Sequence, residues 1–292
     1  ESFPELLPTM HEQWKTVTLE QLLTNHGGAP HGLDADGLWR RLWNHKGTKP
    51  EQRMSLVEAV VAKTPEAAPG TKYIYSNAGF AIAGAIAEKK LGRAWEDLIT
   101  EKLFAPLGMT SAGFGAPGSR EAVDQPRGHT ASKRVMLPGP GSDNPAAIGP
   151  AGIVHCSMDD WAKYIRLHIV GDRLSSLGLP VAHDPAFAPV TLDAAAFKRL
   201  HTPYMQPDSK LSSYAMGWSV STRPWAKGEQ PGDTGRVLTH SGSNTMWYCV
   251  AWIAPEKNFG VMVACNQGGD AANKACDEVA WALIQTYLKV EK

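Results

Sequence analysis

Residues 69–93 read PGTKYIYSNAGFAIAGAIAEKKLGR and contain the strongest structural signal in the chain. From Asn77 to Leu91, small and apolar residues fall on nearly every face of a helical projection, and Gly92 follows them. A helix that is apolar all round has to be buried, and glycine is the usual residue just past a helix end. The stretch therefore predicts a buried helix over residues 77–91.

Tyr75, Ser76 and Asn77 stand directly before this helix. Their spacing places a phenol and a carboxamide side by side at a helix start, where the helix dipole and the unpaired N–H groups favour an anion such as a phenolate. Taken alone, the three residues fit a simpler interpretation better: Asn77 caps the helix and Tyr75 packs. Both interpretations stay open from these residues.

Outward from this helix, capping residues and apolar spacing predict the rest of the helical part. Thr18 with Gln21, and Ser55 with Glu58, have the spacing of a capping box. Between Gly113 and Gly152 the chain is rich in Gly and Pro and lacks periodicity, which predicts a long irregular loop of the kind that is often functional. The predicted helices cover residues 17–24, 55–63, 95–104, 157–169 and 194–200.

After about residue 210 the character of the sequence changes. Runs rich in aromatic and β-branched residues predict strands, and an apolar stripe at helical spacing predicts a terminal helix. We expect an α+β fold with a mainly helical region over 1–209, which holds the Tyr-x-Asn motif and the loop over 113–152, followed by an antiparallel sheet and C-terminal helix over 210–292. The strands are expected at 214–222, 236–240, 246–253 and 259–265, and the helix at 271–288.

Composition excludes several classes of function. The 29 Lys+Arg balance the 29 Asp+Glu in a chain of 292 residues, so the basic excess of a nucleic-acid binder is missing. No apolar run approaches the roughly 20 residues of a bilayer span, and Phe80 to Ala87, for example, covers only eight residues. The four cysteines form no C-x-x-C pair and the ten histidines are scattered. We expect no nucleic acid, no membrane span, no metal and no organic cofactor.

A second candidate site is the run His240-Ser241-Gly242-Ser243, at the end of a predicted strand. His240 is able to donate a proton or bind an anionic group, and Gly242 lets a ligand approach the backbone closely. The backbone N–H of Ser243 is a candidate oxyanion donor. Taken alone, the run fits an ordinary strand-to-loop turn better.

Together and in this order, these segments resemble the serine β-lactamase and penicillin-binding-protein superfamily. The resemblance is strongest to the class C β-lactamase-like branch, which includes esterases and D,D-peptidases. It implies a β-lactamase/transpeptidase-like fold, in which an antiparallel sheet flanked by helices accompanies a mainly helical domain. The segments that carry it are Val17 to Gly28, Pro69 to Arg93, Phe104 to Phe114, Pro150 to Tyr164, Ala215 to Val220, and Leu238 to Trp247.

The resemblance also implies roles for individual residues. Tyr75 matches the tyrosine that transfers the proton, and Asn77 matches the asparagine that contacts the substrate amide. His240, Ser241 and Gly242 match the family's lysine-threonine-glycine triplet, and Ser243 would give one backbone oxyanion donor. The implied reaction is attack of a Ser-x-x-Lys serine on an ester, amide or β-lactam carbonyl, followed by hydrolysis of the acyl-enzyme. The implied partner is a small molecule or peptide with a reactive carbonyl.

Two departures from the family pattern modify this expectation. His240 replaces the usual lysine, and a histidine is half charged only near pH 6.5. It anchors a substrate carboxylate more weakly at neutral pH, which favours an esterase or D-peptidase over a strong β-lactamase. The second departure is that no serine is followed by lysine three residues on.

We therefore expect the nucleophile upstream of residue 1, with N-terminal strands and a nucleophile helix that complete the sheet. That segment would belong to a longer chain or to a separate N-terminal fragment. The alternative is a catalytically inactive homologue that binds D-amino-acid peptides or cell-wall fragments. The family resemblance favours a periplasmic or secreted location.

Overall fold

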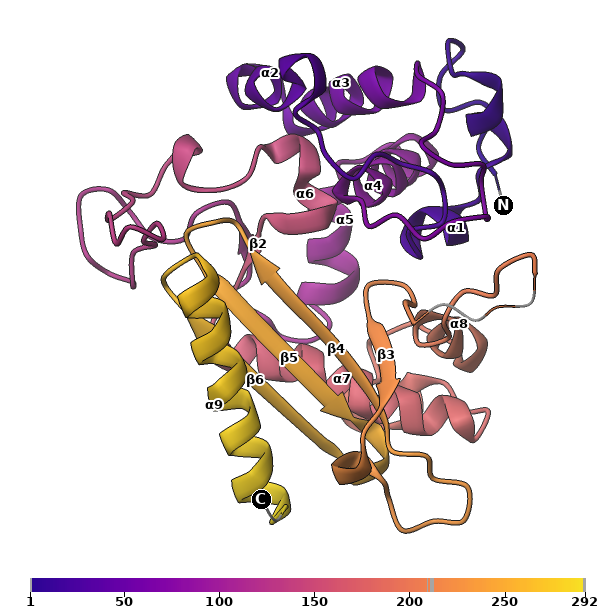
Figure 1. Cartoon of the computed structure of the whole chain (residues 1–292), viewed down its shortest axis with the longest axis vertical. Coiled ribbons are helices and arrows are strands. Elements are labelled where there is room, and N and C mark those ends of the chain that lie inside the picture. Colours follow the sequence, from indigo (N-terminus) through magenta and orange to yellow (C-terminus); the bar gives the residue numbers. More distant parts are fainter. Residues whose placement is uncertain (1, 209, 211–212, 291–292) are drawn as a thin grey trace. The chain divides into compact units, whose positions relative to one another are not determined.

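The computed structural model describes residues 2–208, 210 and 213–290 (Figure 1). They fall into two compact units that interleave along the chain. Unit 1 comprises Glu1–Glu101, Asp143–Val154 and Pro203–Gly217, and unit 2 comprises Lys102–Ser142, His155–Thr202 and Trp218–Lys292. This partition differs from the predicted regions 1–209 and 210–292, and the predicted domain boundary stays a prediction. Ser209, at that boundary, lies outside the described residues.

Unit 1 is built from helices. Thr18 and Gln21 form the predicted capping box at the start of α1. The predicted start of the next helix at Ser55 is wrong, because Thr48 and Glu51 form a capping box that starts α3 before it. The polar first turn of α3 hides this start from apolar periodicity. The helices are α1 (Leu19–Leu23), α2 (Leu38–Asn44), α3 (Lys49–Val61), α4 (Asn77–Leu91), α5 (Trp95–Ile99) and α6 (Gly149–Gly152).

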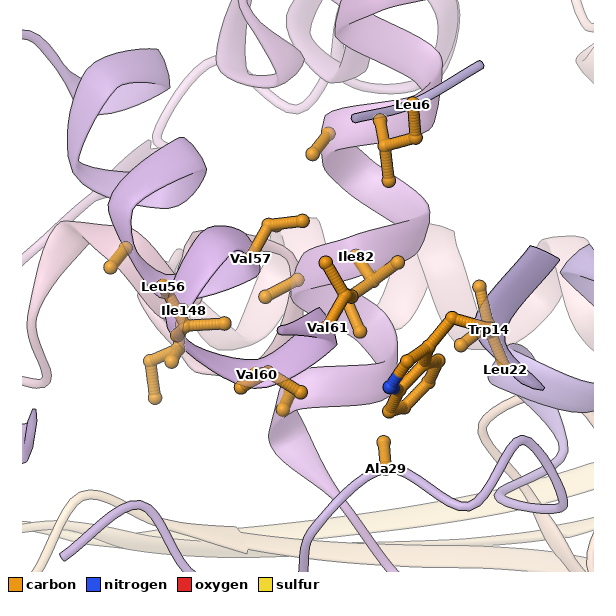
Figure 2. Close-up of a cluster of buried hydrophobic side chains, with 14 of the residues drawn as sticks. Leu6, Trp14, Leu22, Ala29, Leu56, Val57, Val60, Val61, Ile82 and Ile148 are labelled. Atoms are coloured by element: carbon orange, nitrogen blue, oxygen red, sulfur yellow. The ribbon is translucent and has the colours of Figure 1, made fainter. Parts of the chain in front are cut away.

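Helix α4 is the buried helix predicted from residues 77–91, with the predicted bounds and with Gly92 at its end in a left-handed conformation. Small residues allow neighbouring elements to approach it closely. A Cβ on Gly79 would lie 3.1 Å from the carbonyl oxygen of Leu22 in α1. Figure 2 shows Ile82 of α4 in one cluster with Val61 of α3 and Trp14 of the N-terminal segment. Burial of this apolar surface is the main force that holds unit 1 together.

A buried ion group lies within the helices of unit 1. The side chain of Arg53 in α3 is 0% exposed. Its guanidinium lies 2.7 Å from Glu96 in α5 and 3.5 Å from Glu88 in α4. Burial raises the pKa of Glu88. Three helices are thus joined by charges that have little access to water.

Unit 2 contains a four-stranded antiparallel sheet in the order β3-β4-β5-β6. The predicted strand over 259–265 is confirmed, and so is the helix over 194–200. The helix predicted over 95–104 ends at Ile99 and continues as one π-helical turn to Phe104. The strands and helices are β3 (Ser219–Thr222), β4 (Arg236–Ser243), β5 (Tyr248–Ala254), β6 (Phe259–Cys265), α7 (Met158–Ser176), α8 (Ala194–Leu200) and α9 (Asp270–Leu288), with the short strands β1 (Gly113–Phe114) and β2 (Val154–His155).

One helix covers each face of the sheet (Figure 1). Helix α7 begins at the predicted cap, Ser157, and packs Ile165 and Ile169 on one face of β4 and β5. Helix α9 packs Cys276, Ala280 and Ile284 on the other face. The sheet is therefore held between two helices and presents the end of β4 as part of a rigid layer.

No helix among the described residues has both the length and the apolar character needed to cross a bilayer.

A chain of four polar side chains, three of them buried, crosses unit 2. Arg236 at the start of β4 donates two hydrogen bonds of 2.6 Å to Asp172 in α7. Asp172 accepts from Nδ1 of His201 at 2.8 Å, and His201 Nε2 pairs with His168 Nδ1 at 2.8 Å. Because Nδ1 of His201 carries a proton, its Nε2 is an acceptor and His168 is the donor. The chain joins α7, α8 and β4.

The surroundings of His168 set the protonation of this network. Burial places the pKa of His168 well below its usual value, and the nearby His201 lowers it further. Burial also lowers the pKa of His201, although Asp172 acts to raise it. Burial acts to raise the pKa of Asp172, but the hydrogen bond from His201 and the charge of Arg236 hold it below the usual value. The uncharged rings around His168 are those of Tyr164, Phe197 and Trp218.

Acid is expected to destabilise the protein through His168. Because its pKa is lower when folded than when unfolded, the unfolded state binds the extra proton, and stability is lost as pH falls below about 6.5. One such proton corresponds to a slope of about 1.4 kcal/mol per pH unit. Chemical denaturation from pH 7.5 to 5.5 should therefore give a shallower pH dependence for His168→Phe than for the wild type. His183→Gln, at an exposed histidine, should keep the wild-type slope; equal slopes for all three proteins would contradict the assignment.

Candidate active site

Tyr75 ends the extended segment that leads into α4. Its side chain is half-buried, and its carbonyl oxygen accepts a hydrogen bond from His31 Nδ1 at 2.9 Å. The ring of Tyr75 meets that of Tyr214 edge-on, with centroids 6.4 Å apart and an interplanar angle of 89°. Backbone and ring are thus held from two sides within unit 1.

Ser76, not Asn77, is the N-cap of α4. The N–H of Ser76 donates to Asn25 Oδ1 at 3.0 Å, and its hydroxyl donates to the carbonyl of Pro30 at 2.5 Å. Asn77 is the first residue inside the helix. The interpretation that Asn77 caps the helix is therefore wrong, and its half-buried carboxamide is left for another role.

The environment of Tyr75 opposes the phenolate expected from the helix dipole. Burial raises the pKa of the Tyr75 hydroxyl. Burial also raises the pKa values of its neighbours Tyr73 and Tyr214. Desolvation raises the pKa of Tyr75 more than the helix dipole lowers it, because the partial charge at a helix end is small. The phenol is protonated at neutral pH in this structure, and a phenolate requires an additional cation beside it.

Aromatic residues that the sequence did not single out surround this position in unit 1. Tyr73 packs on Tyr214 with ring centroids 5.6 Å apart. His26 stacks on Tyr204 at 4.5 Å and is fully buried, with a pKa lowered by burial. Tyr214 directly precedes the segment Ala215 to Val220, which carries part of the family resemblance. In the sequence, only this neighbouring position could have pointed to Tyr214 as a site residue.

The run from His240 to Ser243 lies inside a strand. β4 extends three residues beyond the predicted end at His240, and β5 pairs with it in the register Ser241↔Val250, Gly242↔Cys249 and Ser243↔Tyr248. The simple strand-to-loop interpretation is therefore wrong. Serine and glycine have low strand propensity, so the local sequence does not predict a strand here. Hydrogen bonding to β5 nevertheless holds these residues in the extended conformation.

Among the residues that the structure describes, no strand pairs with one edge of this part of β4, which is called its open edge. β3 pairs with β4 only from Arg236 to Thr239, so β3 does not reach Ser241, Gly242 or Ser243. All three residues are exposed. Backbone groups on such an edge can pair with an extended ligand.

Side chains in this run alternate between the two faces of the sheet. The register places His240 and Gly242 on the face of Ala251 and Cys249, towards α7, and places Ser241 and Ser243 on the face of α9. The Ser243 hydroxyl donates to the carbonyl of Trp247 at 2.7 Å, which fixes the turn into β5. A Cβ on Gly242 would lie 3.7 Å from Cys249 Sγ. The protein itself thus leaves room for a side chain there, and a need for glycine would come from a ligand.

The predicted site residues fall into both units. Tyr75 and Asn77 belong to unit 1, whereas His240, Ser241, Gly242 and Ser243 belong to unit 2. Each group is therefore described by itself, and their assembly into one site stays a prediction. In the described part of the chain, no group of three or more His, Cys, Asp or Glu side chains is placed to hold a metal ion.

Comparison with known proteins gives a consistent result. A family model described as Beta-lactamase matches residues 5–285. A D-aminopeptidase of Cereibacter sphaeroides (strain KD131 / KCTC 12085) is 32% identical over 274 residues, which cover 91% of this chain and 45% of that protein. A D-aminopeptidase of Brucella canis is 28% identical over 229 residues, covering 77% and 37%. The chain thus spans less than half the length of these curated relatives.

Solved structures agree on the fold. A class C β-lactamase superposes with a TM-score of 0.69 at 19% identity, over 100% of this chain and 75% of that chain. The octameric penicillin-binding protein homologue from Pyrococcus abyssi gives 0.67 at 21% identity, over 97% and 59%. A D-stereospecific amidohydrolase from Streptomyces sp. gives 0.67 at 18%, over 94% and 76%. These likenesses confirm the predicted β-lactamase/transpeptidase-like fold.

Proposed function

Because the chain belongs to the β-lactamase family, we propose that the protein is a serine hydrolase that cleaves amide or ester bonds of D-amino-acid compounds through an acyl-enzyme. The observation that carries the proposal is the open edge of β4 at Ser241–Ser243, which begins next to a histidine rather than a lysine. The similarity to D-aminopeptidases along most of the chain supports the choice of substrate class.

The open edge of β4 suits an extended peptide. A peptide that pairs antiparallel with Ser241–Ser243 would present its carbonyl to backbone donors. The N–H of Ser243 is the proposed donor to the oxyanion, because a fixed backbone dipole stabilises developing negative charge without reorganisation. Gly242 would let the peptide backbone approach without a side chain between.

Tyr75 is the proposed proton-transfer group. Its raised pKa favours the phenol, which gives a proton to the leaving group when the acyl-enzyme forms. Accepting the nucleophile's proton requires a nearby cation that lowers this pKa. Asn77, at the first position of α4, is proposed to bind the substrate amide.

His240 determines the preference among substrates. A lysine would offer a permanent cation at this position and a histidine does not, so a β-lactam carboxylate gains less from His240 than from a lysine. We therefore propose that D-peptides, amides and esters are better substrates than β-lactams.

The nucleophile is not assigned to a residue, since no serine of this sequence has lysine three positions later. The experiment starts from the native polypeptide, with its intact mass measured. A fluorophosphonate and a penicillin probe are then used for labelling, and the labelled peptide is identified. Turnover is measured with D-alanine p-nitroanilide, its L-enantiomer, p-nitrophenyl butyrate and nitrocefin.

The proposal expects one labelled serine, cleavage of the D-anilide in preference to the L-anilide, and slow nitrocefin hydrolysis. A native polypeptide that takes neither label and turns over none of the substrates would overturn it. If that protein still bound D-peptides saturably, the inactive binding homologue would be correct instead.

A further inference from the structure

The loop that follows α1 lies against the segment that leads into α4, within unit 1. Asn25 is the second residue after α1 and is 3% exposed. Its φ of 61° lies in the left-handed region, which asparagine adopts more readily than most residues. The N–H of Asn25 donates to the carbonyl of Leu22 at 3.2 Å, and that of His26 donates to the carbonyl of Gln21 at 2.7 Å. These two hydrogen bonds end α1 in a Schellman motif and so place Asn25.

Asn25 accepts hydrogen bonds from the residues on both sides of Tyr75. The N–H of Ile74 donates to the backbone carbonyl of Asn25 at 2.8 Å, and the N–H of Ser76 donates to its side-chain Oδ1 at 3.0 Å. N–H groups two residues apart lie on the same edge of an extended segment, and the side chains stand roughly perpendicular to the plane of that edge. Fixing both N–H groups therefore fixes the direction in which the Tyr75 side chain leaves the backbone.

Two further hydrogen bonds join the same loop to this segment. His31 Nδ1 donates to the carbonyl of Tyr75 at 2.9 Å, and the Ser76 hydroxyl donates to the carbonyl of Pro30 at 2.5 Å. His31 is exposed, so water competes for its hydrogen bond. Asn25 and Ser76 are 3% and 1% exposed. Because water has little access to the Ser76 N–H, its bond to Asn25 Oδ1 is the one whose loss costs most.

The demands on position 25 select asparagine among the residue types. Glycine suits the left-handed conformation but has no side-chain acceptor. Aspartate has the same shape and an acceptor oxygen, but it would bring a charge into the interior. Asparagine combines tolerance of the left-handed conformation with an uncharged side-chain acceptor.

We propose that Asn25 is a positioning residue for the hydrolysis, which holds the hydroxyl of Tyr75 in place through the backbone on both sides of it. The inference rests on the proposed function and deepens it, because it assigns a role to a residue outside the Tyr-x-Asn motif. Asn25 acts only through Tyr75 and touches no reacting atom. A proton-transfer group works only within hydrogen-bond reach of its partner, and a misplacement of about 1 Å can cost about a hundredfold in rate.

Three variants separate the side-chain acceptor from the backbone conformation. Asn25→Gly keeps the left-handed conformation and the backbone carbonyl but removes Oδ1. Asn25→Asp keeps an acceptor oxygen at the same position and adds a buried charge. Asn258→Gly is the matched control, because Asn258 also has a left-handed φ, of 50°, but is an exposed residue of the turn between β5 and β6 in unit 2.

The measurements are kcat and KM for the D-alanine anilide, stability in urea, and amide hydrogen exchange of Ser76 by NMR. We expect Asn25→Gly to lower kcat by about 10–100-fold with a smaller change in KM, and to speed the exchange of the Ser76 amide. Asn25→Asp should recover most of kcat although its buried charge lowers the stability. Asn258→Gly should match the wild type. Activity that follows stability instead of the acceptor, with Asn25→Asp as slow as Asn25→Gly, would overturn the proposal.

The Tyr75→Phe background shows whether Asn25 acts through Tyr75. In that background Asn25→Gly should lower kcat by less than about twofold, because the hydroxyl that Asn25 positions is already absent. An equal loss in both backgrounds would indicate a general effect on the structure and would overturn the proposal. Should Asn25→Gly not fold, a kcat of Asn25→Asp below about a tenth of the wild-type value would also overturn it.

The same measurements distinguish this proposal from the proposed function. A wild type that takes no fluorophosphonate label and turns over none of the substrates overturns both. An active wild type whose kcat is unchanged in Asn25→Gly overturns only the role of Asn25.

Discussion

Replacing Arg53 by methionine is expected to lower the free energy of unfolding by about 3–5 kcal/mol. The variant removes the cation from a group in which Arg53 is 0% exposed, Glu96 is 6% exposed and Glu88 is 9% exposed. Two carboxylates would then remain in the interior without their partner, and that desolvation cost is much larger than the net contribution of the intact group. Urea denaturation followed by circular dichroism measures the change.

Two further variants test the cause. Lys63→Met breaks the ion pair with Asp36, in which the side chains are 61% and 73% exposed, so its effect should be small. Adding Glu96→Gln to Arg53→Met removes one of the stranded charges and should recover part of the lost stability. A cost for Arg53→Met no greater than that for Lys63→Met would contradict the assignment of a buried ion group.

Tyr75→Phe is expected to lower kcat for hydrolysis by about 10²–10⁴-fold, the usual contribution of a positioned proton-transfer group. The phenyl ring keeps the edge-on contact with Tyr214, so the variant loses the hydroxyl and little packing. The readout is kcat and KM for the D-alanine anilide across pH, with the wild type as reference. Loss of the proton donor should appear in kcat with a small change in KM.

Tyr73→Phe is the matched control for this prediction. Tyr73 lies two residues earlier, is 40% exposed and contacts the same Tyr214 ring, yet it is not the tyrosine of the family motif. It should keep most of the activity. Similar losses in both variants would point to a general disturbance of the aromatic cluster, and wild-type activity in Tyr75→Phe would remove Tyr75 from the mechanism.

Local signals were enough to predict much of this protein. The all-apolar projection of residues 77–91 and the following Gly92 gave α4 with its observed bounds. The pairing of Thr18 with Gln21 gave the start of α1. These features depend on contacts between residues close in sequence, and such contacts can be read from spacing.

Features that depend on distant residues were predicted less well. β4 continues to Ser243 because β5 supplies the ladder partners, and serine and glycine do not indicate a strand by themselves. One of the two interpretations of the Tyr75 motif favoured a phenolate, yet burial raises the pKa of Tyr75. Desolvation of a side chain depends on every residue that packs around it. A motif of three residues therefore cannot give the direction of its pKa shift.

The sequence by itself determined the family, through the resemblance of its segments to known ones, and that resemblance pointed to Tyr75, Asn77 and His240–Ser243. It also determined the order of most elements, because helix and strand periodicity is encoded in spacing along one chain. Only the tertiary structure decided that β3 stops short of Ser241, and that Asn25 accepts hydrogen bonds from the residues on both sides of Tyr75. Those facts depend on which strand ends first and on which loop lies beside the segment before α4. Both are set by packing between segments that are far apart along the chain.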